Sequence, residues 1–119
     1  MKKYLGLLLL LFTVTTQAQS FAKKFNVKEY ANKQTEMIQS TLDLSKEQTE
    51  KVFKANMAKA HSIQKYFILY EQEGRLKGLN MKEALKTVNE DAERASGYIQ
   101  SMKSILGDKL FEKFVDKFE

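Results

Sequence analysis

Cysteine, proline and tryptophan are absent from the 119 residues. Because there is no cysteine, no disulfide can stabilise the fold, and no lipid can be attached at a lipoprotein signal. A small domain must then gain its stability from helix packing or from oligomerisation. Glycine is also scarce, with five residues. Four of them lie in the second half of the chain: Gly74, Gly78, Gly97 and Gly107. The helical pattern is expected to break at three of these, Gly74, Gly78 and Gly107.

Histidine occurs once, as His61. A metal site on a helix would need further ligands three or four residues away on the same face. Those positions hold Met57, Ala58, Gln64 and Lys65. Since two of these residues are apolar and one is a cation, we expect His61 to be an exposed surface residue and predict no metal site.

The acidic residues of the second half of the chain gather at Glu90, Asp91 and Glu93. We expect them to form a solvated helix face rather than an acid–base site, because Glu90 is spaced to pair with Arg94 four residues later. The sequence also contains no Cys–His pair and no glycine-rich phosphate loop. We therefore predict no catalytic residue, no cofactor and no enzymatic activity.

The first eighteen residues have the pattern of a secretory signal peptide. Lys2 and Lys3 precede an apolar run from about residue 5 to residue 14, and small or polar residues follow. Thr16 and Ala18 occupy the small positions of a cleavage site, so we expect cleavage after Ala18, with cleavage after Ser20 as the alternative. The apolar run is shorter than the roughly 20 residues that a membrane-spanning helix needs. These features predict a periplasmic or secreted protein without stable membrane insertion.

Residues 19–119 are expected to form one all-α domain, since apolar residues recur at steps of three and four. The pattern predicts four helices, over residues 27–42, 45–73, 81–106 and 108–118. The third has the most regular spacing, which is typical of a helix lying along a neighbour. We therefore expect the second and third helices to form a long central antiparallel hairpin joined at residues 74–80. Gly97 would lie inside the third helix. Glycine destabilises a helix interior relative to alanine, and close packing of a neighbouring helix would compensate this loss.

The start of the second helix carries a capping box, in which the side chain of Ser45 caps the backbone of Gln48 and Gln48 caps Ser45 in return. Asn80 and Glu83 repeat this arrangement at the start of the third helix. Leu44, directly before the first cap, is expected to pack beneath the second helix. Both caps fix where a long helix begins and hence its register.

The Leu-Ser-x-x-Gln motif formed by Leu44, Ser45 and Gln48 resembles the Leu-Thr-x-x-Gln box of the Spy/CpxP-like periplasmic family. In that family the box occurs twice, and Leu106 stands where the second box would begin. The resemblance implies a thin, curved, all-helical molecule, usually a homodimer, that shields unfolded clients or senses envelope stress. It also implies partners among unfolded or envelope proteins.

Aromatic and cationic residues alternate near the expected mature N-terminus, at Phe21, Lys23, Lys24, Phe25 and Lys28. Export removes nucleic acid as a partner, so two readings remain. This segment is either frayed or loosely docked, or it makes weak contact with an anionic membrane surface or an acidic client.

The apolar arc of the second helix is wider than one partner helix can cover. It is flanked by lysines, and such a surface can hold varied chains loosely. The first and fourth helices could bury this arc; alternatively it forms a dimer interface or a surface for clients. The candidate protein-binding surface comprises Val52, Phe53, Lys59, Tyr66, Phe67, Leu69 and Tyr70.

The sequence thus predicts a protein that binds other proteins. The leading hypothesis is an ATP-independent chaperone or an envelope-stress accessory protein. The alternative is a structural or regulatory helical module that docks one specific envelope partner.

Overall fold

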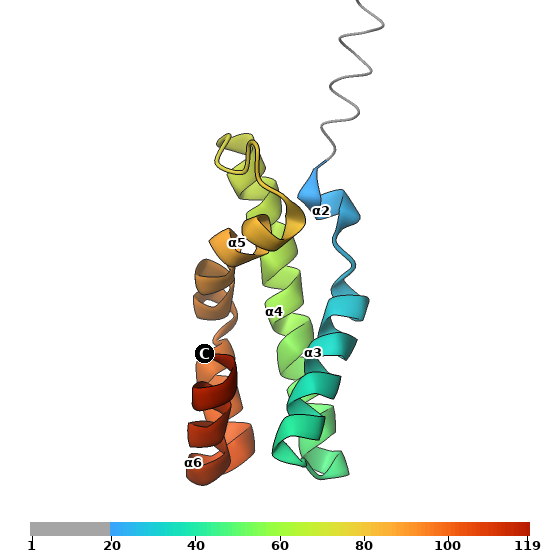
Figure 1. Ribbon diagram of the computed structural model, residues 1–119, viewed down its shortest axis with the longest axis vertical. Coiled ribbons are helices and arrows are strands. Elements are labelled where there is room, and N and C mark those ends of the chain that lie inside the picture. The colour runs from blue at the N-terminus through green and yellow to red at the C-terminus, as the bar shows by residue number, and fades with distance from the viewer. Residues whose placement is uncertain (1–19) are drawn as a thin grey trace, which may run out of the picture.

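The computed structural model describes residues 20–119, which form five helices and no strand (Figure 1). The expected all-α fold class is confirmed, whereas the expected signal peptide lies outside the described residues. Within residues 20–119, no helix combines the length and the apolar character needed to cross a membrane. In chain order the helices are α2 (Phe21–Lys24), α3 (Val27–Leu42), α4 (Lys46–Gln72), α5 (Met81–Ser96) and α6 (Tyr98–Phe118).

Helix α4 is the axis of the molecule. Its 27 residues span about 40 Å at 1.5 Å per residue. Figure 1 shows α3 and α6 flanking its lower half, while α2 and α5 lie about its upper half. The other helices therefore contact α4 in two groups, one towards each end.

The expected caps at the starts of α4 and α5 are confirmed. The Gln48 N–H donates to Ser45 Oγ at 3.1 Å, and the Ser45 N–H donates to Gln48 Oε1 at 3.2 Å. The Glu83 N–H donates to Asn80 Oδ1 at 2.8 Å, and the Asn80 N–H donates to Glu83 Oε1 at 3.2 Å. Leu44 is buried, as expected.

The third expected helix is not continuous, which corrects the sequence prediction for residues 81–106. Gly97 ends α5 in a left-handed conformation, with φ 65° and ψ 28°. A Cβ placed on Gly97 would meet no atom within 4 Å, so close packing does not explain this residue. Its role is the positive φ that a helix end commonly requires.

A second break lies inside α6, where Gly107 has φ 77° and ψ 170°. The chain descends along α4 to this glycine and then returns upward (Figure 1). Phe114 on the returning part thereby packs against Tyr98 on the descending part, with 6.1 Å between ring centres. The returning part corresponds to the fourth helix expected over residues 108–118. Leu106, which precedes the break, is buried.

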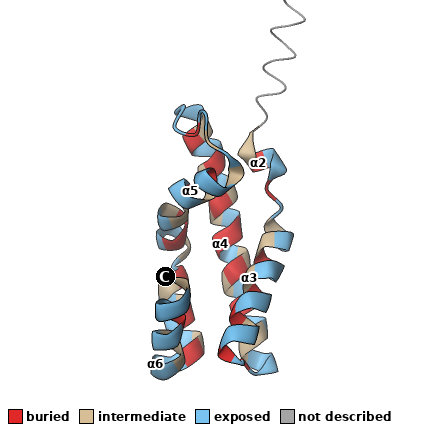
Figure 2. Cartoon of the chain, viewed as in Figure 1, coloured by how far each residue is buried: buried red, intermediate tan, exposed pale blue. Residues whose placement is uncertain are grey.

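Two apolar clusters occupy the interior on either side of the middle of α4, and buried residues follow the inner face of that helix (Figure 2). The upper cluster joins α2, α4, α5 and the turn after α4: Ala22, Phe25, Ala60, Ile63, Phe67, Tyr70, Leu76, Ala84, Val88 and Ala92. The lower cluster joins α3, α4 and α6: Ile38, Leu42, Leu44, Val52, Tyr98, Met102, Leu106 and Phe114.

Candidate functional site

A buried polar layer separates the two clusters along α4. Lys59 Nζ lies 3.0 Å from Glu93 Oε2, and the two side chains are only 7% and 10% exposed. The same ammonium lies 4.4 Å from the centre of the Tyr98 ring. Because α4, α5 and α6 each contribute one of these residues, the ion pair fixes their relative positions. The Glu93 carboxylate compensates the positive charge of the buried ammonium, which is typical of a structural ion pair.

The polar layer continues towards α3. The side-chain amide of Asn56 donates to Thr35 Oγ1 at 2.9 Å, and the Thr35 hydroxyl donates to the carbonyl of Ala31 at 2.7 Å. Asn56 is fully buried, and its Oδ1 has no hydrogen-bond partner within residues 20–119. An orphaned buried oxygen is costly, so this layer is less stabilising than an apolar one of the same shape.

A small polar cavity of about 170 Å³ adjoins the layer, and Tyr30, Lys59, Tyr98 and Glu119 are among the residues that line it. Partial burial, together with the charge of Glu93, raises the pKa of the Glu119 carboxyl to about 7. Burial also raises the pKa of the Tyr30 and Tyr98 hydroxyls above their usual value. Both tyrosines are therefore neutral hydrogen-bonding groups at physiological pH.

The acidic residues of α5 are not all exposed to solvent, which corrects the solvated face expected from the sequence. Glu90 is exposed and pairs with Arg94 at 3.2 Å, as expected. Glu93 is instead buried against Lys59, and Asp91 accepts a hydrogen bond from the Tyr70 hydroxyl. His61 is exposed, as expected. Among residues 20–119, no cluster of three or more His, Cys, Asp or Glu side chains is placed to hold a metal ion.

The predicted protein-binding surface is corrected by the structure, because four of its seven members are buried: Val52, Lys59, Phe67 and Tyr70. The neighbouring helices cover the wide apolar arc of α4, which was one of the open alternatives. Phe53 and Tyr66 are half-buried. Leu69 remains 44% exposed, and the adjacent Ile68 is 49% exposed.

The N-terminal aromatic segment is docked rather than frayed. The backbone N–H groups of Phe21 and Ala22 donate to the Glu71 carboxylate at 3.0 and 3.4 Å. The Gln64 side chain donates to the Ala22 carbonyl at 3.1 Å. The rings of Phe21 and Phe25 pack on Phe67, with centre distances of 5.9 and 5.5 Å. Helix α2 is therefore part of the upper cluster.

The docking of α2 creates an open groove between this short helix and the turn that joins α4 to α5. We call it the tip groove; its volume is about 860 Å³. Apolar side chains and two lysines contribute to its lining: Phe21, Leu76, Leu79, Met81, Lys24 and Lys77. A concave apolar lining with a few charged groups is the usual form of a binding site.

The sequence analysis did not identify the tip groove, although it carried one signal for it. Leu76 and Leu79 lie in the short turn between α4 and α5, where polar residues are the rule. Leu76 is buried in spite of lying in a turn. Two leucines in such a turn indicate a local apolar site, but only the docking of α2 opposite them forms a groove.

The chain was compared with protein-family models, curated proteins and solved structures, and none of them matches it.

Proposed function

We propose that this chain is an exported protein-binding protein, an ATP-independent chaperone or envelope-stress accessory of the Spy/CpxP type. The observation that supports the proposal is the tip groove, which is open, mainly apolar and bordered by flexible lysines. An apolar lining accepts side chains of many shapes, and lysine side chains adapt to partners without fixed geometry. Such a site suits weak binding of varied, partly unfolded chains.

Exposed apolar side chains next to the groove extend this surface. Ile68 and Leu69 lie one turn before Gln72, which borders the groove. Large apolar residues exposed beside a groove are typical of interaction sites. The same residues are candidates for a homodimer interface, and sedimentation of the purified protein would detect a dimer.

The proposal is tested by following the aggregation of several unrelated, chemically unfolded proteins without ATP. We expect the protein to slow aggregation at near-stoichiometric ratios. Leu79→Asp places a charge in the groove and should weaken the effect. Met37→Asp, at an exposed apolar residue on α3, is the matched control. If the protein protects none of the clients, the chaperone proposal is wrong.

The second candidate function is a helical module that docks one specific envelope partner. The rigid attachment of α2 at the edge of the groove favours it, because a preorganised site binds one partner at lower entropic cost. Capture from an envelope extract separates the two functions. Many weakly bound proteins support the chaperone, and one tightly bound protein supports the docking module.

A further inference from the structure

The tip groove is lined by more cationic than acidic side chains. Lys24 and Lys77 are exposed cations, and neither forms an ion pair with any residue of the described chain. Glu71 is the acidic lining residue, but its carboxylate accepts the backbone N–H groups at the start of α2. The groove therefore presents two available positive charges beside an apolar floor.

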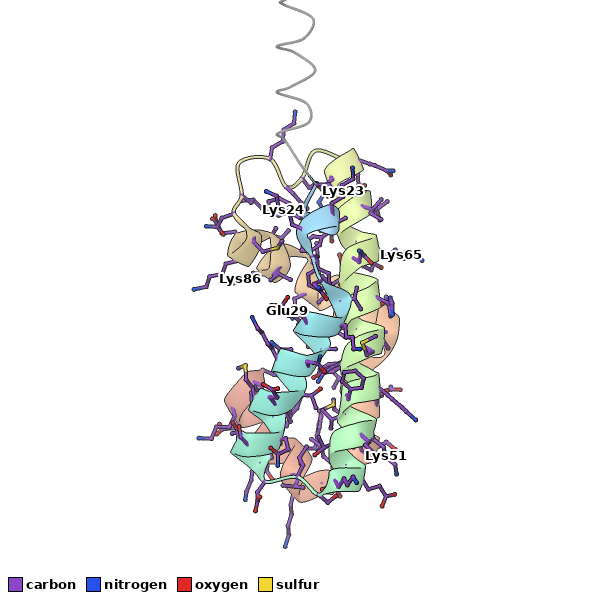
Figure 3. All side chains as sticks on the ribbon, turned by 90° about the vertical axis from the view of Figure 1, so that its right-hand side faces the viewer. Lys23, Lys24, Glu29, Lys51, Lys65 and Lys86 are labelled. Atoms are coloured by element: carbon purple, nitrogen blue, oxygen red, sulfur yellow. The ribbon has the colours of Figure 1, made fainter. Side chains whose placement is uncertain are left out.

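Further cations lie about the same end of the molecule. Figure 3 shows Lys23 and Lys24 on α2 and Lys86 on α5 in the upper half of the view, whereas Lys51 lies at the opposite end. Lys51 is already paired with Glu47 at 3.4 Å. The surroundings of the groove thus add to its positive potential, which attracts acidic segments and repels basic ones.

We infer that the tip groove selects partner segments in which apolar side chains lie next to aspartate or glutamate. This inference rests on the proposed function and names the class of client. Apolar side chains of the segment would pack on Phe21, Leu79 and Met81, and its carboxylates would meet Lys24 and Lys77. The discrimination comes from charge, because the apolar floor alone accepts any apolar segment.

A protein segment fits the groove better than a membrane surface does. The apolar lining lies between α2 and the turn after α4, so a flat lipid surface would meet the rim rather than the floor. Helix α2 has only four residues, which is too short for an amphipathic helix that inserts into an interface. The volume of about 860 Å³ lies in the range of sites for compact ligands.

The test measures fluorescence anisotropy of labelled peptides with the processed, exported protein. One peptide carries leucines next to aspartates and glutamates; the second replaces these acids by asparagine and glutamine; the third replaces them by lysine. We expect the acidic peptide to bind about 2- to 30-fold more tightly than the amide peptide, which is the range for two exposed ion pairs. The difference should shrink as salt is added.

Two charge-reversed variants locate the effect. Lys24→Glu with Lys77→Glu should abolish the preference for the acidic peptide. Lys109→Glu with Lys113→Glu changes the net charge equally on α6 and should retain it. Circular dichroism checks that both variants stay helical. Equal losses in both variants would mean that only net charge matters, and would overturn the inference.

The remaining outcomes separate the inference from the proposed function. If the acidic and amide peptides bind equally while aggregation is still suppressed, the charge selection is wrong but the proposed function stands. If neither peptide binds and no client is protected, both are wrong. Vesicles of phosphatidylglycerol and phosphatidylcholine are the competitor. If they bind through Lys24 and Lys77 and displace the peptide, the partner is a lipid surface and the inference is overturned.

Discussion

The two ends of α4 are covered by different kinds of structure. At the lower end, full helices pack on α4, and a short connection leads from α3 through Leu44 to the cap at Ser45. At the upper end, only α5 is a full helix, and a four-residue helix and a longer turn complete the cluster. Short elements cannot cover the end of a helix completely, and the tip groove remains there. The candidate binding site therefore lies where the chain supplies the least regular structure.

The largest expected effect comes from removing the ring at the centre of the upper cluster. Phe67→Ala should lower the free energy of unfolding by about 3–5 kcal/mol, since it leaves a cavity in a closed site. Phe114→Ala should cost a similar amount in the lower cluster. Urea unfolding measures both losses.

Hydrogen exchange shows whether the two ends respond separately to these substitutions. Phe67→Ala should also speed exchange at the Phe21 and Ala22 amides, because α2 docks on this ring. Phe114→Ala should leave these amides protected. Equal exposure of α2 in both variants would mean that the two clusters behave as one.

The next effect concerns the polar layer that joins the two ends. Glu93→Ala leaves the Lys59 ammonium buried without its partner and should cost about 3 kcal/mol. The double variant Lys59→Met with Glu93→Leu should be close to neutral, because it removes both charges together. Urea unfolding of the single and double variants checks this. A double variant as unstable as the single one would show that the ion pair itself is strongly stabilising.

Gly97 distinguishes the observed break from a continuous third helix. In its left-handed conformation, Gly97→Ala should destabilise the protein by about 1 kcal/mol. In a helix interior the same substitution would stabilise it by about the same amount. Gly97→Asn should cost less, because asparagine tolerates this conformation. A fall in melting temperature for Gly97→Ala would support a helix end at this residue, and a rise would support a continuous helix.

The smallest effect is a pH dependence at Glu119. Its pKa is about 7 in the folded protein and 4.5 in a free chain, so the folded state binds the proton more tightly. The resulting stability is fully present below about pH 4.5 and is lost as the pH rises through 7. Because the carboxyl is only partly buried and solvent screens it, we expect an effect of less than about 1 kcal/mol on the free energy of unfolding. Between pH 5 and 8 the wild type should lose more melting temperature than Glu119→Gln; parallel curves would contradict this.

Local signals in the sequence identified the helix starts correctly. Ser45 and Asn80 cap α4 and α5 through bonds that involve only nearby residues. A short-range pattern is enough to predict such contacts. The bounds expected for the first helix, residues 27–42, also agree with α3.

The buried face of α4 was only partly predictable from the apolar spacing. Val52 and Lys59 were expected on a binding surface, yet both are buried, as is Asn56 between them. The buried stripe of α4 includes the polar residues Asn56 and Lys59, which a pattern of apolar residues does not detect. Their burial depends on hydrogen bonds with Thr35 and Glu93 from other helices. The tip groove was not predicted for the same reason. It forms only when α2 docks on Phe67 and Glu71, which lie much later in the chain.

The reversal at Gly107 also bears on the order in which the molecule folds. Helices α3 and α4 are consecutive, so their contacts can form while the chain is still emerging. The polar layer is different, because Glu119 borders the same small cavity as Tyr30 and Lys59. The lining of this cavity is therefore complete only after the chain has reversed at Gly107 and residue 119 is in place.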